Sequence, residues 1–174
     1  MNKTRFFTTF LLLLLVQICI ANFFRLSQYV TLSILPAMIL LIPIKHGNVT
    51  ALLIAFVTGL AVDLLSDGLI GLNALALVPV AFCRLGIIRL IFGDEVFARK
   101  EDISIPRQGV WKMSVAIFMA LAIFLFIYIW ADGAGTRPLW FNGIRLAASL
   151  AGSYILSIFV ANILAPERTS GARR

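Results

Sequence analysis

The sequence predicts an all-α integral membrane protein, a single compact bundle of six transmembrane helices that occupies residues 1–174. Hydrophobic residues make up 61% of the chain and charged residues only 13%, whereas a soluble domain carries about 25% charged residues. The apolar residues form runs long enough to cross a bilayer. The polar stretches between these runs are short, so no second, soluble domain is expected.

Each expected span follows from an apolar run and from the polar or helix-breaking residues beside it. The first run follows Lys3 and Arg5 and is too long for the core of a signal peptide, the competing interpretation. The second contains Pro36 and Pro43, so we expect a kink or an early end there. Arg84 follows the fourth run and is expected to snorkel to the interface. The spans are predicted at about 6–24, 29–44, 49–65, 69–84, 112–130 and 144–164.

Small residues recur every four positions in the third span. Ala51, Ala55 and Gly59 lead to Asp63 at this spacing, which places them on one narrow, slowly turning strip of a helix. Small residues on such a strip let another helix approach closely, and a polar residue at its end can hydrogen-bond across. The strip therefore serves either packing inside the bundle or contact with the helix of a partner. Gly143, Ala147 and Ala151 give the sixth span a second face of small residues.

Polar residues cluster where the third span passes into the fourth, and they make up the candidate site: Asp63, Ser66, Asp67, Gly68, Gly71 and Asn73. Ser66, Asp67 and Gly68 predict a tight turn. Ionisable residues in a membrane are costly, so each is a candidate functional residue. We expect Asp63 to bond Asn73, or the backbone at the start of the fourth span. In that structural role Asp63→Asn should be tolerated, and Asp63→Leu should cost about 1 kcal/mol.

The distribution of basic residues predicts the orientation. With six spans, twelve of the 15 Lys and Arg residues lie on one side of the membrane, and Arg25, Arg137 and Arg145 lie on the other. The positive-inside rule then places both termini and the loop 93–109 in the cytoplasm. The net charge of +7 is accounted for by topology, so no nucleic-acid partner is expected. Cys19 and Cys83 fall in opposite leaflets and should not pair.

The chain lacks the motifs of common enzymes. It has no Walker loop, no HExxH, no CxxC and no Gly-x-Ser-x-Gly. Asp63 and Asp67 stand four residues apart at the end of one helix, an arrangement that does not favour an aspartyl enzyme. We therefore expect no enzymatic activity, no cofactor and no metal site. Ion or proton coupling through Asp63 is a further alternative, but no internal repeat supports a transporter fold.

The segment Gly59–Ala76 resembles the signature of the MreD family, the rod shape-determining proteins of the bacterial inner membrane. In that family a span ends in an Asp-Leu-Leu-Ser-x-Gly turn, and the next opens with Gly-Leu and a polar residue before Ala-Leu. Asp63, Ser66, Gly68, Gly71 and Asn73 stand in those places.

The resemblance implies a non-enzymatic scaffold of the cell elongation machinery, which maintains rod shape. The implied partners are an MreC-like single-span protein, a RodA-type glycosyltransferase with its transpeptidase partner, the MreB cytoskeleton and membrane lipid, with a homodimer as a further option. MreD proteins look like the S components of energy-coupling-factor vitamin transporters. The alternative function is therefore that of a substrate-binding subunit of such an importer.

Overall fold

The computed structural model describes residues 3–23, 30–44, 47–66, 69–93, 109–133 and 137–164. Most of these residues are helical. The helices are α1 (Lys3–Phe23), α2 (Leu35–Leu40), α3 (Gly47–Leu65), α4 (Leu72–Phe92), α7 (Val110–Gly133) and α8 (Leu139–Leu164). All of these helices except α2 are long and apolar enough to cross a membrane. The chain is therefore a multi-pass membrane protein, as its composition predicts.

The second span is the main correction to the prediction. Among the described residues of the expected span 29–44, only Leu35–Leu40 is α-helical, and residues 31–34 before it are not helical. Pro36 lies at the start of α2, where its missing N–H costs nothing, and Pro43 follows the last turn, where a proline stops a helix. The prolines therefore shorten the helix much more than a kink would. We call residues 30–44 the broken span.

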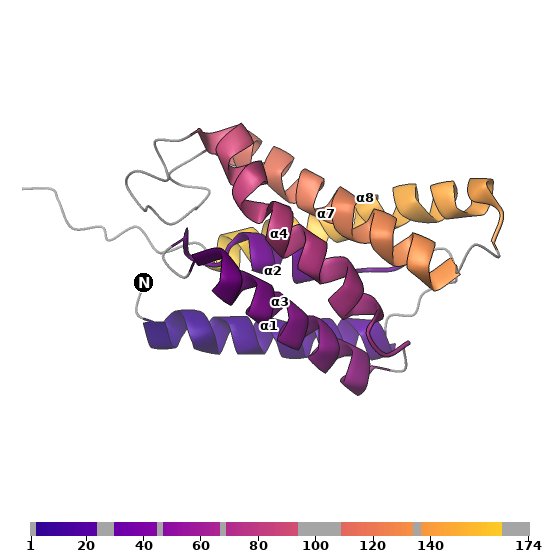
Figure 1. Ribbon diagram of the computed structural model, residues 1–174, viewed down its shortest axis with the longest axis horizontal. Helices are drawn as coiled ribbons and strands as arrows, with labels where there is room; N and C mark the ends of the chain where they lie inside the picture. Colours follow the sequence, from indigo (N-terminus) through magenta and orange to yellow (C-terminus); the bar gives the residue numbers. More distant parts are fainter. Residues whose placement is uncertain are drawn as a thin grey trace, which may run out of the picture.

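The broken span still bridges the two ends of the molecule. In Figure 1, α1 and α3 both run from left to right, so the chain between them has to return, and α2 lies in the middle of that return path. Residues 30–33, if extended, cover about 13 Å, and residues 34–40, the N-cap and the helix α2, cover about 10 Å. Together they span most of the hydrocarbon core, which is about 30 Å thick. The broken span follows the return path that the sequence predicts for the second crossing, and Leu35–Leu40 is its α-helical part.

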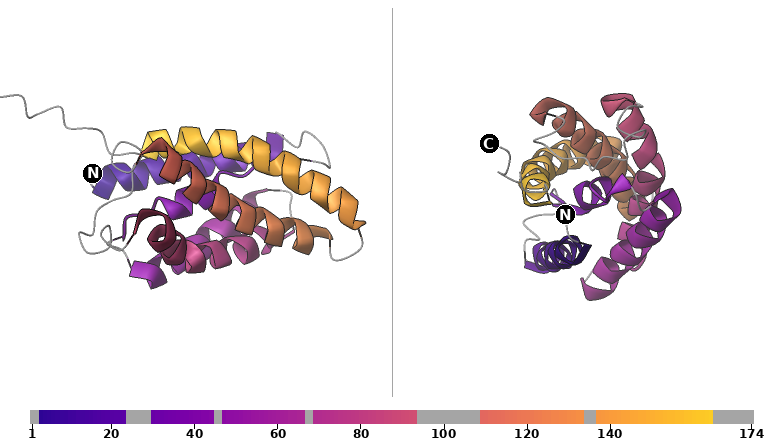
Figure 2. Two further views of the ribbon diagram at one scale, coloured as in Figure 1. Left: turned by 90° about the horizontal axis from the view of Figure 1, so that it is seen from above. Right: turned by 90° about the vertical axis from the view of Figure 1, so that its left-hand side faces the viewer.

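The long helices form a ring around α2. Seen end-on in Figure 2, the order around the ring is α1, α3, α4, α7 and α8, and each helix contacts its neighbours. All six residues of α2 are buried. Helix α1 is the most peripheral member, since only 11% of its span is buried, against 28–44% for the other four. Helix α2, the shortest of the described helices, thus lies at the centre of this bundle.

The boundaries of the other spans differ from the prediction at their ends. Helix α4 continues to Phe92, past the expected end at residue 84, and Pro79 lies inside it. Helix α8 begins at Leu139, ahead of the expected start at residue 144. The loop 93–109, apart from its two end residues, lies outside the described residues.

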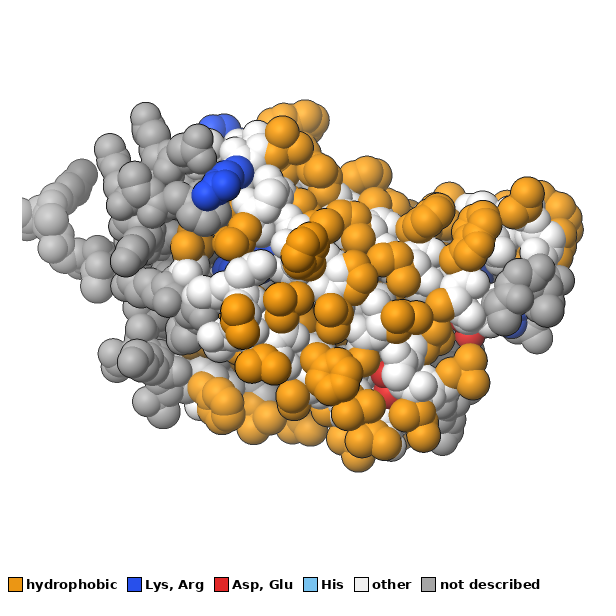
Figure 3. Space-filling view, in the orientation of Figure 1, with side chains coloured by type: hydrophobic (Ala, Val, Ile, Leu, Met, Phe, Trp, Pro, Cys, Tyr) orange, Lys and Arg blue, Asp and Glu red, His pale blue; other side chains and the backbone are white. Residues whose placement is uncertain are grey.

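The surface along the bundle is apolar, as contact with lipid requires. Figure 3 shows hydrophobic side chains over the middle of the visible face, with charged side chains toward the ends. Phe7, Phe82 and Ile155 are 68%, 69% and 59% exposed. The small-residue face Gly143, Ala147 and Ala151 is also exposed.

The starts of α1, α3 and α7 share one end of the molecule with the ends of α4 and α8 (Figure 1). This arrangement agrees with the expected alternation of spans. The cytoplasmic assignment of that end rests on the charge count and stays a prediction.

Candidate functional site

Asp63 lies near the carboxyl end of α3, with only 2% of its surface exposed. Its Oδ1 accepts hydrogen bonds from the backbone N–H of Asn73, at 3.0 Å, and from Asn73 Nδ2, at 2.9 Å. Its Oδ2 accepts from the backbone N–H groups of Gly71, at 3.0 Å, and Ala74, at 3.2 Å. The predicted bond between Asp63 and Asn73 is confirmed, as is the bond to the backbone at the start of the fourth span.

These bonds make Asp63 a cap for α4. The first N–H groups of a helix have no partner within it, and the residue at the N-cap of α4, Gly71, has no side chain to supply one. Gly71 adopts φ +92°, a left-handed conformation that favours glycine. The carboxylate of α3 therefore takes the place that a capping side chain would normally fill.

Gly59 sets the distance between α3 and α4. A Cβ atom at this position would lie 2.5 Å from the Cα of Ala74 and 2.6 Å from its nitrogen. The two helices therefore touch backbone to backbone one turn before Asp63, which brings the carboxylate within reach of α4. Ala51 and Ala55 on the same strip are fully buried. The strip packs inside the bundle, so the alternative of contact with a partner is wrong for this face.

The rest of the predicted turn is described only in part. The backbone N–H of Ser66 donates to the carbonyl of Val62, at 2.9 Å, and continues the end of α3. Asp67 and Gly68 lie outside the described residues. Asn22, in the last turn of α1, donates from Nδ2 to the carbonyl of Leu65, at 3.0 Å. Nothing in the sequence points to this capping of α3 by α1, since Asn22 and Leu65 lie 43 positions apart.

The extended part of the broken span is held by serines of α8. The N–H groups of Thr31 and Ser33 donate to the hydroxyls of Ser149, at 2.8 Å, and Ser153, at 3.0 Å. Four residues of helix rise about 6 Å and two extended residues about 6.6 Å, so serines spaced by four match alternate residues of an extended chain. Gly152 makes room for this, since a Cβ there would lie 2.6 Å from Leu32 Cδ2.

Gln17 of α1 holds the other edge of the same segment. Its Oε1 accepts from the N–H of Ile34, at 2.8 Å, and its Nε2 donates to the carbonyl of Leu32, at 3.4 Å. Non-helical backbone at membrane depth is tolerated only where protein groups satisfy it. Side chains of α1 and α8 supply those groups. The signals in the sequence were a glutamine inside the first span and serines at 149, 153 and 157 in the sixth.

Arg84 is fully buried, and the expectation that it snorkels to the interface is wrong. Its Nε donates to the carbonyl of Leu40, at 3.1 Å, and its Nη2 donates to the carbonyl of Ile42. These carbonyls lie at the end of α2, where a helix leaves acceptors unpaired and carries partial negative charge. The guanidinium therefore caps the end of the broken span from α4.

Arg137 and Arg145, which entered the prediction only through the charge count, both bond to the carboxylate of Asp132 near the end of α7. Asp132 Oδ2 accepts from Nη1 of Arg145 and, at 3.4 Å, from Nη1 of Arg137. Nη2 of Arg145 also donates to Thr31 Oγ1, at 3.0 Å, which ties this group to the broken span. The two cysteines are both free, Cys19 exposed and Cys83 half-buried.

Taken together, these polar residues hold backbone in place. Within the described ranges, no group of three His, Cys, Asp or Glu residues could bind a metal ion. Asp63, Arg84, Gln17 and the serines each bond to main-chain groups of another segment. Comparison of the chain with protein-family models, with curated proteins and with solved structures finds no match.

Proposed function

We propose that this chain is a non-enzymatic membrane scaffold of the MreD type, part of the cell elongation complex in the bacterial inner membrane. In this role it links an MreC-like single-span protein and the peptidoglycan-synthesising pair to the MreB cytoskeleton. The observation that carries the proposal is that three residues of the MreD-like signature form hydrogen bonds between two helices. Asp63, Gly71 and Asn73 join α3 to α4 through hydrogen bonds.

A scaffold needs rigid helices more than it needs reactive groups. Both oxygens of Asp63 are occupied by N–H donors, four in all. A carboxylate bonded in this way fixes geometry, and it has little capacity left for a substrate or an ion. This supports a structural role for the motif over coupling through Asp63.

One observation favours the second candidate, a substrate-binding subunit of an energy-coupling-factor importer. Transporters often build their binding sites from discontinuous helices near the middle of the membrane. Residues 30–44 are such a segment, and Gln17, Ser149 and Ser153 line it. In this chain, however, these side chains hydrogen-bond to the segment's own backbone, which leaves the scaffold as the first choice.

Recovery of partners from native membranes tests the two functions. The tagged protein is expressed at its natural level, extracted in mild detergent, and its bound proteins are identified by mass spectrometry. A tagged membrane protein of unrelated function and similar size serves as control. An MreC-like protein in the sample but not in the control supports the scaffold. An ATPase module without an MreC-like protein overturns it in favour of the importer.

A further inference from the structure

The charge cluster between α7 and α8 has a surplus positive charge that the scaffold role does not use. Asp132 comes from the last turn of α7, Arg137 from the turn and Arg145 from the second turn of α8. One carboxylate faces two guanidinium groups, so the formal charge of the cluster is +1. The negative end of α7 and the positive end of α8 meet here and offset each other, so the formal charges decide the sign.

The two arginines differ in how much bonding capacity they have left. Arg145 is 8% exposed and is bonded to Asp132 and Thr31, while its Nε is buried without a partner. The side chain of Arg137 is 37% exposed, and its bond to Asp132 is long, at 3.4 Å. Its guanidinium carbon lies 5.7 Å from the centre of the Phe141 ring. Because a guanidinium has five N–H donors, Arg137 can bind a further anion without leaving Asp132.

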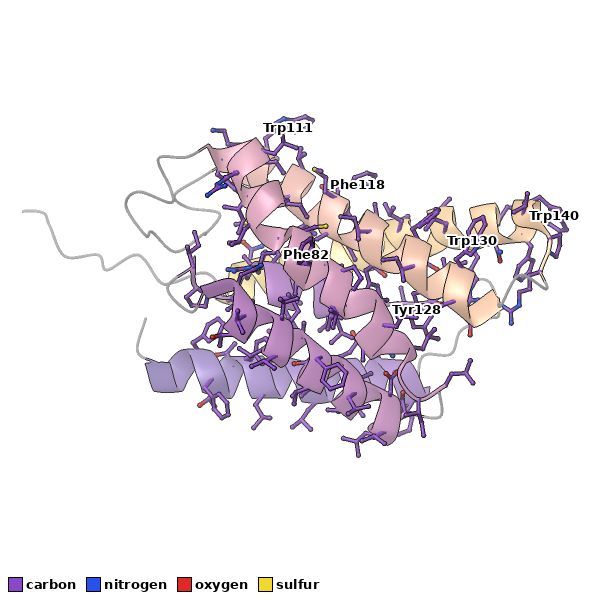
Figure 4. The ribbon with its side chains drawn as sticks, in the orientation of Figure 1. Phe82, Trp111, Phe118, Tyr128, Trp130 and Trp140 are labelled. Atoms are coloured by element: carbon purple, nitrogen blue, oxygen red, sulfur yellow. The ribbon has the colours of Figure 1, made fainter. Side chains whose placement is uncertain are left out.

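Apolar side chains around the cluster indicate which kind of anion fits. Leu139, Trp140 and Trp130 are 72%, 66% and 49% exposed. Figure 4 shows the two tryptophans toward the end where α7 passes into α8, and Trp111 at the opposite end. Exposed tryptophans are typical of the interface between membrane and water. Cationic and exposed apolar side chains therefore occur together at this end of α7 and α8, as the headgroup and the acyl part of a lipid require.

We propose that Arg137 and Arg145, which both bond to Asp132, form a binding site for the phosphate group of an anionic phospholipid. Arg137 contacts the headgroup, and buried Arg145 adds the positive charge that Asp132 alone does not balance. Leu139, Trp130 and Trp140 contact the interfacial and acyl parts of the lipid. A free phosphate ion offers the same oxygens but lacks the apolar part, so it should bind much more weakly.

Thermal unfolding of the purified protein tests this proposal without any partner protein. The protein is held in a neutral detergent, and phosphatidylglycerol, phosphatidylcholine or inorganic phosphate is added. Phosphatidylglycerol should raise the Tm progressively as its concentration increases, and the other two should not. The effect should weaken in high salt, because the arginine is partly exposed.

Variants then locate the site. Arg137→Ala should raise the concentration of phosphatidylglycerol needed for half of the Tm shift about fivefold, and Arg137→Lys should retain most of the affinity. Lys112→Ala, an exposed cation at the start of α7, is the matched control and should leave the shift unchanged. Asp132→Asn raises the formal charge of the cluster and should strengthen binding.

The opposite outcomes overturn the proposal. Unchanged affinity in Arg137→Ala shows that the lipid binds elsewhere, and an equal loss in Lys112→Ala shows that any interfacial cation suffices. A shift of the same size with inorganic phosphate shows that the acyl part plays no role. Unchanged or weaker binding in Asp132→Asn shows that the surplus charge does not attract the lipid.

Discussion

Replacing Asp63 tests whether the turn between α3 and α4 is held by hydrogen bonds. The carboxylate accepts two bonds at each oxygen, and all four donors are N–H groups. In Asp63→Asn one oxygen remains, which can keep the pair from Asn73. The new NH₂ group then faces the N–H groups of Gly71 and Ala74, where it cannot accept. The sequence alone predicts that this variant is tolerated, but the geometry predicts that it loses half of the bonds.

The expected magnitudes follow from the number of bonds lost. A hydrogen bond between membrane helices contributes on average about 0.6 kcal/mol and at most about 1.7 kcal/mol. Asp63→Asn loses two bonds and should lower the free energy of unfolding by about 1–3 kcal/mol. Asp63→Leu loses all four and should cost about twice as much. Asn73→Ala removes only the bond from Nδ2 at 2.9 Å, so it should cost about 1 kcal/mol and serves as the matched control.

The assay is reversible unfolding in mixed micelles, with restoration of cell shape scored at equal protein level in a strain lacking the native protein. Stability should decrease in the order wild type, Asn73→Ala, Asp63→Asn and Asp63→Leu. The degree to which rod shape is restored should decrease in the same order. Asp63→Asn as stable as wild type would refute the bond count. A loss of function in Asp63→Asn with unchanged stability and partner binding would show instead that the charge itself acts, as ion coupling requires.

Three further predictions follow from the fold. Gly59→Leu should lower the yield of folded protein, measured by size-exclusion chromatography, because α3 and α4 touch at this glycine. The control Gly86→Leu should not lower it, since the space around Gly86 is open. Equal yields of the two variants would contradict the close contact. Arg84→Met should lower the free energy of unfolding by about 2–4 kcal/mol because charge-assisted bonds to two carbonyls are lost. Arg84→Lys should recover part of this loss in the same unfolding assay. Unchanged stability in Arg84→Met would show that the end of α2 does not need its cap. Single cysteines at Ser104 and Gly135, in a cysteine-free background, should react with an impermeant thiol reagent in intact cells only at 135; labelling at 104 alone would reverse the predicted orientation.

The sequence by itself determined the features that depend on neighbouring residues. The length of an apolar run decides whether a helix can cross a bilayer, so the five long helices were predicted, with errors at their ends. The bond between Asp63 and Asn73 joins residues ten positions apart across a short turn. Its two partners lie at similar depth on consecutive antiparallel helices, which the order of the chain already shows.

Only the tertiary structure decided the form of the broken span and the roles of the residues that hold it. Hydropathy measures how well a segment avoids water, and it does not show where the segment's backbone hydrogen bonds go. In residues 30–44 several backbone groups outside the short helix bond to distant parts of the chain. Arg84 reaches the carbonyl of Leu40 across 44 positions, and Ser149 reaches the N–H of Thr31 across 118. An extended segment is stable inside a membrane only when other parts of the protein satisfy its backbone hydrogen bonds. The packing of α1, α4 and α8 around residues 30–44 places the side chains that do so.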